Sequence, residues 1–312
     1  MAAPVFCFAV LVAGALFLMP VPENSPHPDF LQKISLSPAP PIDKIPFPWY
    51  NTLDYKYFGI LCPPGQNGEC EAVRTNIMGI TFDNITLAQA VDRGETLAKG
   101  ADFSYVVTPN PEIVNYGRAD GDYAAILNGA GLVLPDGIGV VYASRILGTP
   151  LTERVPGADF AEGLLGRLAK NGGRLFLLGA KPGVAEEAGR RMRAAHPGLV
   201  ICGTHDGYFT DSAPVVETIR EARADVVFVC LGAPKQEKWM AEYGPQTGAH
   251  LMVGLGGVLD VYAGNVKRAP VFWQKIGLEW FYRLLHQPSR FGRMAKLPLF
   301  LVDAAKEKGK KS

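Results

Sequence analysis

The chain lacks the short motifs with which many enzymes hold a metal ion, a dinucleotide or an activated serine. H-E-x-x-H and C-x-x-C are absent and the histidines show no metal-ligand spacing, so we expect no metal and no organic cofactor. G-x-G-x-x-G and the G-K-[ST] lysine pattern are also missing, which argues against dinucleotide binding and ATP hydrolysis. The absence of G-x-S-x-G argues against the nucleophile turn of many serine hydrolases.

The chain also lacks an excess of one charge. A net charge of +1 over 312 residues argues against a general nucleic-acid binder. The charge is uneven, however, because residues 271–312 hold nine Lys or Arg and three acidic residues, a net charge of +6, which leaves −5 on the rest. A basic end on an almost neutral protein predicts an anionic partner for that end. The five cysteines, an odd number, favour a reduced cytosolic protein, with Cys202 and Cys230 as buried apolar residues.

The first 20 residues contain no charged side chain, and three interpretations are open for them. They are long enough to anchor the chain in a bilayer, they resemble a signal peptide without its positive start, or they are translated from a start codon placed too early. Eleven of the 25 prolines lie between Pro20 and Pro64, so we expect a disordered linker over residues 21–74. A core over residues 75–270 and an appendage over residues 271–312 complete the predicted organisation.

Six apolar runs each end in a turn rich in Gly or Pro, and most are followed by a helical stretch. They are SYVV, LVL, RLFLLGA, LVICG, VVFVCLGA and HLMVGLG. This rhythm predicts an α/β fold with a Rossmann-like, doubly wound, mostly parallel sheet. Ligands of such sheets bind outside the carboxyl ends of the strands. The polar residues expected at that edge are Thr108, Asn110, Asp136, His205, Asp206, Lys235, Gln236 and Asp260.

Several local structures follow from turn and cap signals. NIMGITFDNIT alternates apolar and polar residues and predicts a strand or hairpin, and Thr86 is a candidate N-cap for the next helix. Residues 111–130 are expected to form one helix, with Pro111 in its first turn. The C-terminal segment is expected to be helical, with Pro288 and Pro298 as breaks.

Two turns offer candidate catalytic groups, each with two interpretations. Asp136 either caps the helix expected at Ile138, which stabilises it by about 1 kcal/mol, or serves as a general base at the mouth of the site. Thr108 and Asn110 either form a plain turn or line a site for an anion such as a diphosphate, because the following helix N-terminus favours negative charge.

Two further segments carry candidate binding residues. Lys235 and Gln236 begin a helix after a strand end, where they either hold a ribose, uracil or pyrophosphate group or are solvated polar residues. In the C-terminal segment, aromatic residues alternate with basic ones that include Arg283, Arg290 and Arg293. That pattern predicts contact with an anionic membrane surface or bidentate binding of a diphosphate, with a packed helix and a solvated basic face as the alternative.

The order of these motifs resembles one known family. From Asn76 to Met294 the chain carries TPNPEIV, VLPDGIGVVYASRILGTPLTERVPGADF, FLLGAKPGVAEEA, VFVCLGAPKQEKWM, GLGGVLDVYAG and LEWFYRLLHQPSRFGR, which resemble the WecG/TagA/CpsF family of bacterial glycosyltransferases. The resemblance implies inverting, metal-independent transfer of an N-acetylmannosamine-type sugar from a UDP donor to polyprenyl-diphosphate-linked N-acetylglucosamine. It also implies a peripheral enzyme on the inner face of the plasma membrane, in teichoic acid or surface polysaccharide synthesis.

The resemblance also implies residue roles. Asp136 would be the base that deprotonates the acceptor hydroxyl, and Thr108 and Asn110 would line the acceptor and donor site. Arg154 and Gln236 would hold the donor or orient the acceptor. The three C-terminal arginines would clamp the lipid diphosphate. These roles agree with the residue chemistry, because a direct displacement needs one base and, without a metal, arginines and N–H groups to stabilise the leaving UDP.

Other functions remain to be separated from this one. Within the same family, a mannosaminuronic acid or glucose-type donor would use the same frame. An NAD-dependent oxidoreductase is disfavoured by the missing glycine fingerprint. A sugar-nucleotide-binding or membrane-scaffolding module without catalysis is the non-enzyme alternative, and a homo-oligomer is a further expectation.

Overall fold

The computed structural model describes residues 8–12, 15–19, 74–266, 269–270, 273, 282 and 296–311, and the chain divides into two units, residues 1–67 and 68–312. In the first unit, β1 (Phe8–Val12) pairs antiparallel with β2 (Ala15–Met19). The predicted proline-rich linker lies outside the described residues. Within the described part of the chain, no helix is both long and apolar enough to cross a bilayer.

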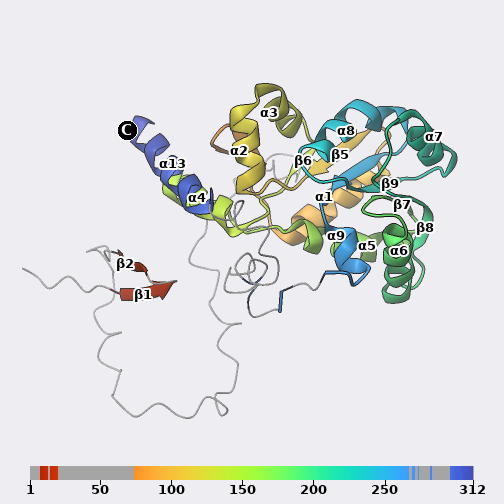
Figure 1. Cartoon of the computed structure of the whole chain (residues 1–312), viewed down its shortest axis with the longest axis horizontal. Helices are drawn as coiled ribbons and strands as arrows, with labels where there is room; N and C mark the ends of the chain where they lie inside the picture. The colour runs from red at the N-terminus through yellow and green to blue at the C-terminus, as the bar shows by residue number, and fades with distance from the viewer. Residues whose placement is uncertain are drawn as a thin grey trace, which may run out of the picture. The chain divides into compact units, whose positions relative to one another are not determined.

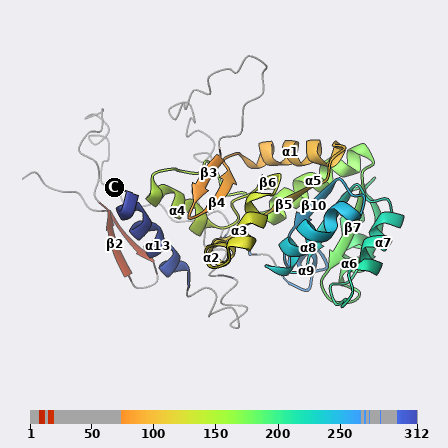
Figure 2. The ribbon, with the colours of Figure 1, turned by 90° about the horizontal axis from the view of Figure 1, so that it is seen from above.

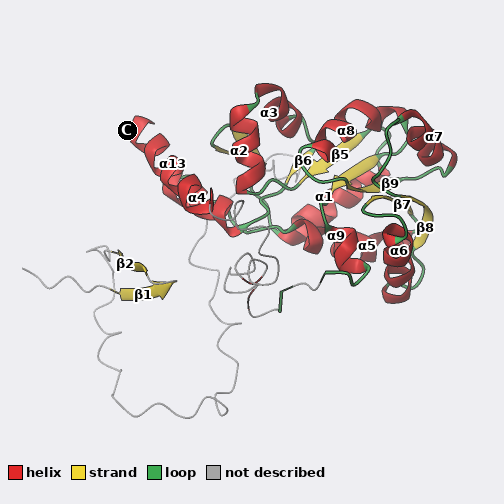
Figure 3. Ribbon diagram, in the orientation of Figure 1, coloured by secondary structure: helices red, strands yellow, loops and turns green. Residues whose placement is uncertain are grey.

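The second unit contains a six-stranded sheet in which every neighbouring pair is parallel (Figures 1 and 3). The strand order is β6-β5-β10-β9-β7-β8. The predicted α/β fold with a Rossmann-like parallel sheet is therefore confirmed, and each of the six apolar runs forms one strand. The bounds are β5 (Ser104–Val107), β6 (Leu132–Val133), β7 (Arg174–Gly179), β8 (Val200–His205), β9 (Val226–Cys230) and β10 (Leu251–Gly254).

Two apolar clusters cover the two faces of this sheet because successive strand residues point to opposite faces. Val106, Leu177, Phe228 and Val253 join the cluster that contains residues of α1 (Leu87–Lys99), α5 (Gly157–Asn171), α6 (Val184–Ala195) and α9 (Val258–Tyr262). The cluster with Val107 and Phe176 instead contains residues of α2 (Pro111–Ala119), α3 (Gly121–Asn128), α7 (Ala213–Glu221) and α8 (Lys235–Tyr243). A 3-10 turn, Gly244–Gln246, follows α8.

The local signals at the start of this unit are confirmed. β3 (Arg74–Ile77) and β4 (Ile80–Asp83) form an antiparallel hairpin. Thr86 caps α1 in a capping box, in which its hydroxyl accepts from the Gln89 N–H and the Gln89 side chain accepts from the Thr86 N–H.

The prediction of one helix over residues 111–130 is wrong, because the chain forms α2 and α3 with a break at Asp120. The Asp120 side chain accepts from the Tyr123 N–H at 3.0 Å and so caps α3. An Asp followed by Gly is a helix-start signal, and this local hydrogen bond competes with continuation of α2.

The last described helix, α13 (Lys296–Lys311), packs on α4 (Ile138–Leu147) and α2. Figure 2 shows the same element from above. Phe300 and Ala304 are buried in the cluster of the second sheet face. Pro298 lies in the first turn of α13, where a missing N–H costs nothing, while the expected break at Pro288 lies outside the described residues. Arg283, Arg290 and Arg293 lie outside the described residues.

A buried carboxylate supports the edge strand that leads to the Asp136 turn. Asp83 is fully buried, and it accepts from the Val133 N–H of β6 at 2.8 Å. Its other oxygen forms ion pairs with Arg74 at 3.3 Å and Arg93 at 3.1 Å. The hairpin and α1 therefore hold β6 through one side chain.

We expect Asp83→Ala to destabilise the protein by about 3 kcal/mol, because it leaves a buried N–H without its acceptor and two arginines without their partner. Urea unfolding of the purified protein measures this loss. Asp92→Ala, which breaks the exposed ion pair with Arg167, is the control and should change stability little. Equal stability of the two variants would contradict the role given to Asp83.

Candidate active site

Backbone hydrogen bonds join the turns that follow β5 and β6. The Leu134 N–H donates to the Val107 carbonyl at 2.9 Å, and the Asp136 N–H donates to the Pro109 carbonyl at 3.2 Å. The two turns thus continue the sheet pairing past the strand ends. Thr108, Asn110 and Asp136 are consequently held in neighbouring turns, as the sequence predicts for parallel strands.

Asp136 is partly buried, and its carboxylate faces the start of α5. Its Oδ2 accepts from the Gly157 N–H at 3.3 Å. The interpretation of Asp136 as the cap of the helix at Ile138 is wrong, because the N-cap of α4 is Gly137, without a side-chain cap bond. Gly137 has φ +117°, a conformation that favours glycine and turns the chain sharply after Asp136.

Arg154 lies in the loop between α4 and α5, and this loop is bonded to the Asp136 turn. The Val155 N–H donates to the Pro135 carbonyl at 3.0 Å, and Arg154 itself is partly buried. The loop therefore brings the backbone at Arg154 next to the turn that carries Asp136, although helix α4 separates the two residues along the chain.

Thr108 and Asn110 use their side chains differently. Thr108 is 7% exposed and donates its hydroxyl to the Gly254 carbonyl at 3.1 Å, so it joins the β5 turn to the end of β10. Asn110 is the N-cap of α2, and its Oδ1 accepts from the Glu112 and Ile113 N–H groups at 2.9 and 3.1 Å. The side-chain oxygen of Asn110 is therefore used within its own turn, as the plain-turn interpretation expects. Ligand binding by Thr108 or Asn110 stays a prediction.

Lys235 belongs to a second group of turns, which follow β7, β8 and β9. Its Nζ donates to the Gly207 carbonyl at 3.2 Å and lies 4.7 Å from the centroid of the Phe209 ring. The Gly207 N–H donates to the Ala180 carbonyl, and the Asp206 side chain accepts from the Tyr208 N–H. The sequence thus placed Lys235, His205 and Asp206 correctly at the carboxyl edge, but on these turns rather than beside Asp136.

Gln236 connects the two groups of turns from inside the protein. It is 2% exposed, its Oε1 accepts from the Gly256 N–H at 2.9 Å, and its Nε2 donates to Glu237 at 2.7 Å. A solvated Gln236 is therefore excluded. The Gly254–Gly257 turn that it supports also accepts the Thr108 hydroxyl, so Gln236 and Thr108 hold the same turn.

Sequence reasoning missed Glu237 and Tyr123. Glu237 is fully buried and accepts the Tyr123 hydroxyl at 3.0 Å. Burial raises the pKa of Glu237 above its usual value, and burial together with the Glu237 charge raises the pKa of Tyr123. An available signal was the spacing of Glu237 and Met240 on α8, which places an acid on the apolar face of that helix.

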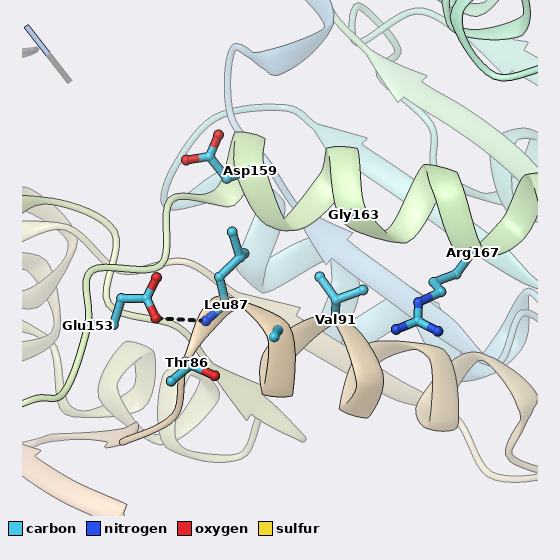
Figure 4. A pocket seen from close by; sticks show the side chains of 8 residues that line it. Thr86, Leu87, Val91, Glu153, Asp159, Gly163 and Arg167 are labelled. Atoms are coloured by element: carbon cyan, nitrogen blue, oxygen red, sulfur yellow. Dashed lines mark hydrogen bonds between the residues drawn. The ribbon is translucent and has the colours of Figure 1, made fainter. Parts of the chain in front are cut away.

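A separate depression of about 550 Å³ lies between α1 and α5 (Figure 4). Its lining includes Thr86, Val91, Glu153, Asp159 and Arg167. Glu153 accepts from the Leu87 N–H at 3.2 Å, which is the dashed line in Figure 4. None of the predicted site residues lines it, so it is not the candidate site. Within the described residues, no three His, Cys, Asp or Glu side chains are grouped as a metal site.

A parallel sheet with helices on both faces and bonded polar turns along its carboxyl edge defines the doubly wound class of α/β proteins. Residues 75–312 match the model of the glycosyl transferase WecG/TagA/CpsF family. The chain belongs to this family. The match begins one residue after the start of β3 and includes α13.

Curated relatives from Staphylococcus aureus carry one name. The protein of strain MW2 is 36% identical over 239 residues, which cover 76% of this chain and 94% of the relative. The protein of strain NCTC 8325 gives the same identity and coverage. Both are named N-acetylglucosaminyldiphosphoundecaprenol N-acetyl-beta-D-mannosaminyltransferase.

We expect Thr108→Val to reduce stability by about 1 kcal/mol, because it leaves the buried Gly254 carbonyl without its donor. Thr108→Ser keeps the hydroxyl and should retain the hydrogen bond, so the difference between the two variants separates the bond from packing. Urea unfolding measures both. A Thr108→Val protein as stable as the wild type would show that the hydroxyl does not hold the β10 turn.

Proposed function

We propose that this protein transfers N-acetylmannosamine from UDP to a hydroxyl of N-acetylglucosamine carried on a polyprenyl diphosphate, as a step of teichoic acid or surface polysaccharide synthesis. The observation that carries the proposal is the match over 94% of the Staphylococcus aureus transferase. The six strands, the joined turns and α13 all fall inside the matched family region, residues 75–312. A mannosaminuronic acid or glucose-type donor is the alternative within the same frame.

Asp136 acts as the general base in this proposal. The acceptor oxygen attacks the anomeric carbon while its proton passes to the Asp136 carboxylate, and the bond from that carbon to the UDP oxygen breaks with its electron pair on UDP. One displacement inverts the anomeric centre. The Gly157 N–H fixes one carboxylate oxygen at the start of α5, which supports a defined direction for proton transfer.

The charge that develops on UDP needs positive partners. The backbone N–H groups in the turn before α6 lie at the carboxyl edge, where a diphosphate is favoured. Arg154 reaches the same edge through the Val155 to Pro135 hydrogen bond. Lys235 offers a further cation on the second group of turns. Arg283, Arg290 and Arg293 are proposed to bind the diphosphate of the acceptor lipid.

Helix α13 supports a peripheral position on the inner face of the membrane. A Cβ on Gly139 would overlap Leu297 and Pro111, so the start of α13 lies against the first turns of α4 and α2. Those turns come directly after Asp136 and Asn110. Leu299 and Val302 are 64% and 49% exposed, and lysines follow them on the same helix. Exposed apolar residues with nearby lysines suit an anionic lipid surface.

The first test is UDP release from residues 75–312 with UDP-N-acetylmannosamine, a short-chain lipid-diphosphate N-acetylglucosamine and EDTA. We expect acceptor-dependent release, and a fall of about 10²-fold or more in kcat for Asp136→Asn with the fold retained, because the amide cannot take the proton. Circular dichroism checks the fold.

UDP binding without turnover would move the question to the donor sugar. Absence of UDP binding would contradict the transferase, and full activity of Asp136→Asn would favour another base or a binding module.

We expect the double variant Leu299→Glu, Val302→Glu to lose binding to vesicles that contain anionic lipid, because two apolar contacts become charged. Both side chains are exposed, so stability should change little. Vesicle co-sedimentation measures binding. Val200→Glu, on an exposed apolar residue of β8, is the matched control. Equal binding of wild type and double variant would contradict a membrane role for this face.

A further inference from the structure

Four residues from three parts of the fold form one hydrogen-bonded chain beneath the site. The Tyr123 hydroxyl of α3 donates to Glu237 Oε2, and Gln236 Nε2 donates to Glu237 Oε1. The Gly256 N–H then donates to Gln236 Oε1. Figure 1 shows α3 near α8, in agreement with the contacts between these helices. These hydrogen bonds thus connect α3 and α8, which pack on the second face of the sheet, to the turn after β10.

The Gln236 amide has only one orientation that satisfies both of its neighbours. A flipped amide would place Oε1 against a carboxylate oxygen, which has no proton to offer, and Nε2 against the Gly256 N–H, which cannot accept. The contact with Glu237 is buried and the contact with Gly256 is partly buried, so each mismatch would leave a desolvated polar group without its partner. Glu237 therefore decides which end of Gln236 faces Gly256.

The turn held in this way is part of the site wall. Gly256 has φ +58°, in the left-handed region, and Gly254 accepts the Thr108 hydroxyl at 3.1 Å. A Cβ on Gly254 would come within 3.0 Å of Gln236 Nε2 and 2.9 Å of Met240 Cε, so the side chain packs directly on this turn. Gln236 bonds Gly256 and Thr108 bonds Gly254, and only Leu255 lies between these two glycines. A shift of the Gln236 amide would consequently also shift the carbonyl that holds Thr108.

We infer that Glu237 and Tyr123 are positioning residues, which act through the Gln236 amide to hold the Gly254–Gly257 turn and Thr108 in the geometry that turnover needs. The inference rests on the proposed function for its kinetic consequence only. Neither side chain is accessible to substrate, since Glu237 is 0% and Tyr123 1% exposed.

The isosteric variant Glu237→Gln is the sharpest test. Its amide can present either an acceptor or a donor to Gln236, so the Gln236 orientation is no longer specified while the volume is unchanged. We expect the Gly256 amide to exchange with solvent about tenfold faster by NMR hydrogen exchange. We also expect kcat to fall by about tenfold or more, with little change in the dissociation constant of UDP.

Tyr123→Phe should act in the same direction, and Tyr105→Phe is its matched control. Tyr105 is a partly buried tyrosine, and its hydroxyl donates to the Ile126 carbonyl of helix α3 and makes no described bond to Glu237. Both changes remove one tyrosine hydroxyl bond. Tyr123→Phe should speed Gly256 exchange and lower kcat, whereas Tyr105→Phe should do neither. This difference should hold even if the two variants lower the thermal unfolding midpoint by the same amount.

The Glu237→Gln, Tyr123→Phe double variant should lose little more kcat than Glu237→Gln alone, because both residues act through one amide. Unchanged Gly256 exchange in Glu237→Gln, or equal kcat losses in the two tyrosine variants, would overturn the inference. A wild-type protein without transferase activity would instead contradict the proposed function, and the exchange measurement would still decide the positioning role.

Discussion

The hydrogen bonds that continue the parallel sheet beyond its strand ends are the constraint on which the site depends. Here the turn after β6 is bonded to the turn after β5 through Pro109, and the loop before α5 is bonded to the β6 turn through Pro135. Because prolines supply both carbonyls, those two positions have no N–H of their own to satisfy. These hydrogen bonds therefore fix the position of Asp136 relative to the sheet.

A second layer of support reaches the same turns through side chains. Asp83 holds the edge strand from the hairpin side, Thr108 joins the β5 turn to β10, and Gln236 joins β10 to α8. Each of these side chains is buried and bonded to a backbone group. Buried polar groups of this kind specify one arrangement, because an alternative packing would leave donors or acceptors without partners.

The strands, most helices and the shared edge could be predicted from sequence, since apolar runs, caps and glycine turns are local signals. What could not be predicted was the pairing of side chains across the fold. Asn110 caps its own helix as its position after TP suggests, but nothing local shows that Asp136 faces Gly157, twenty-one residues away. Glu237 was overlooked because an acid beside Lys235 and Lys238 looks solvated, whereas its place on the inner face of α8 buries it. Asp120 broke a predicted helix because a single side-chain cap outweighed the helical pattern around it.

The burial of Phe300 has a consequence for biosynthesis. Phe300 lies in the same apolar cluster as Ile77 and Phe82 of the β3–β4 hairpin, although more than two hundred residues separate them. Domains commonly begin to fold while the chain is still being made, starting from the N-terminal side. In this protein the helix layer on the second face of the sheet, which includes α13, stays incomplete until α13 has left the ribosome. The nascent chain consequently carries an open apolar face on α4 and α2 from the synthesis of α4 until that of α13, and exposed apolar surface of this kind is what chaperones bind.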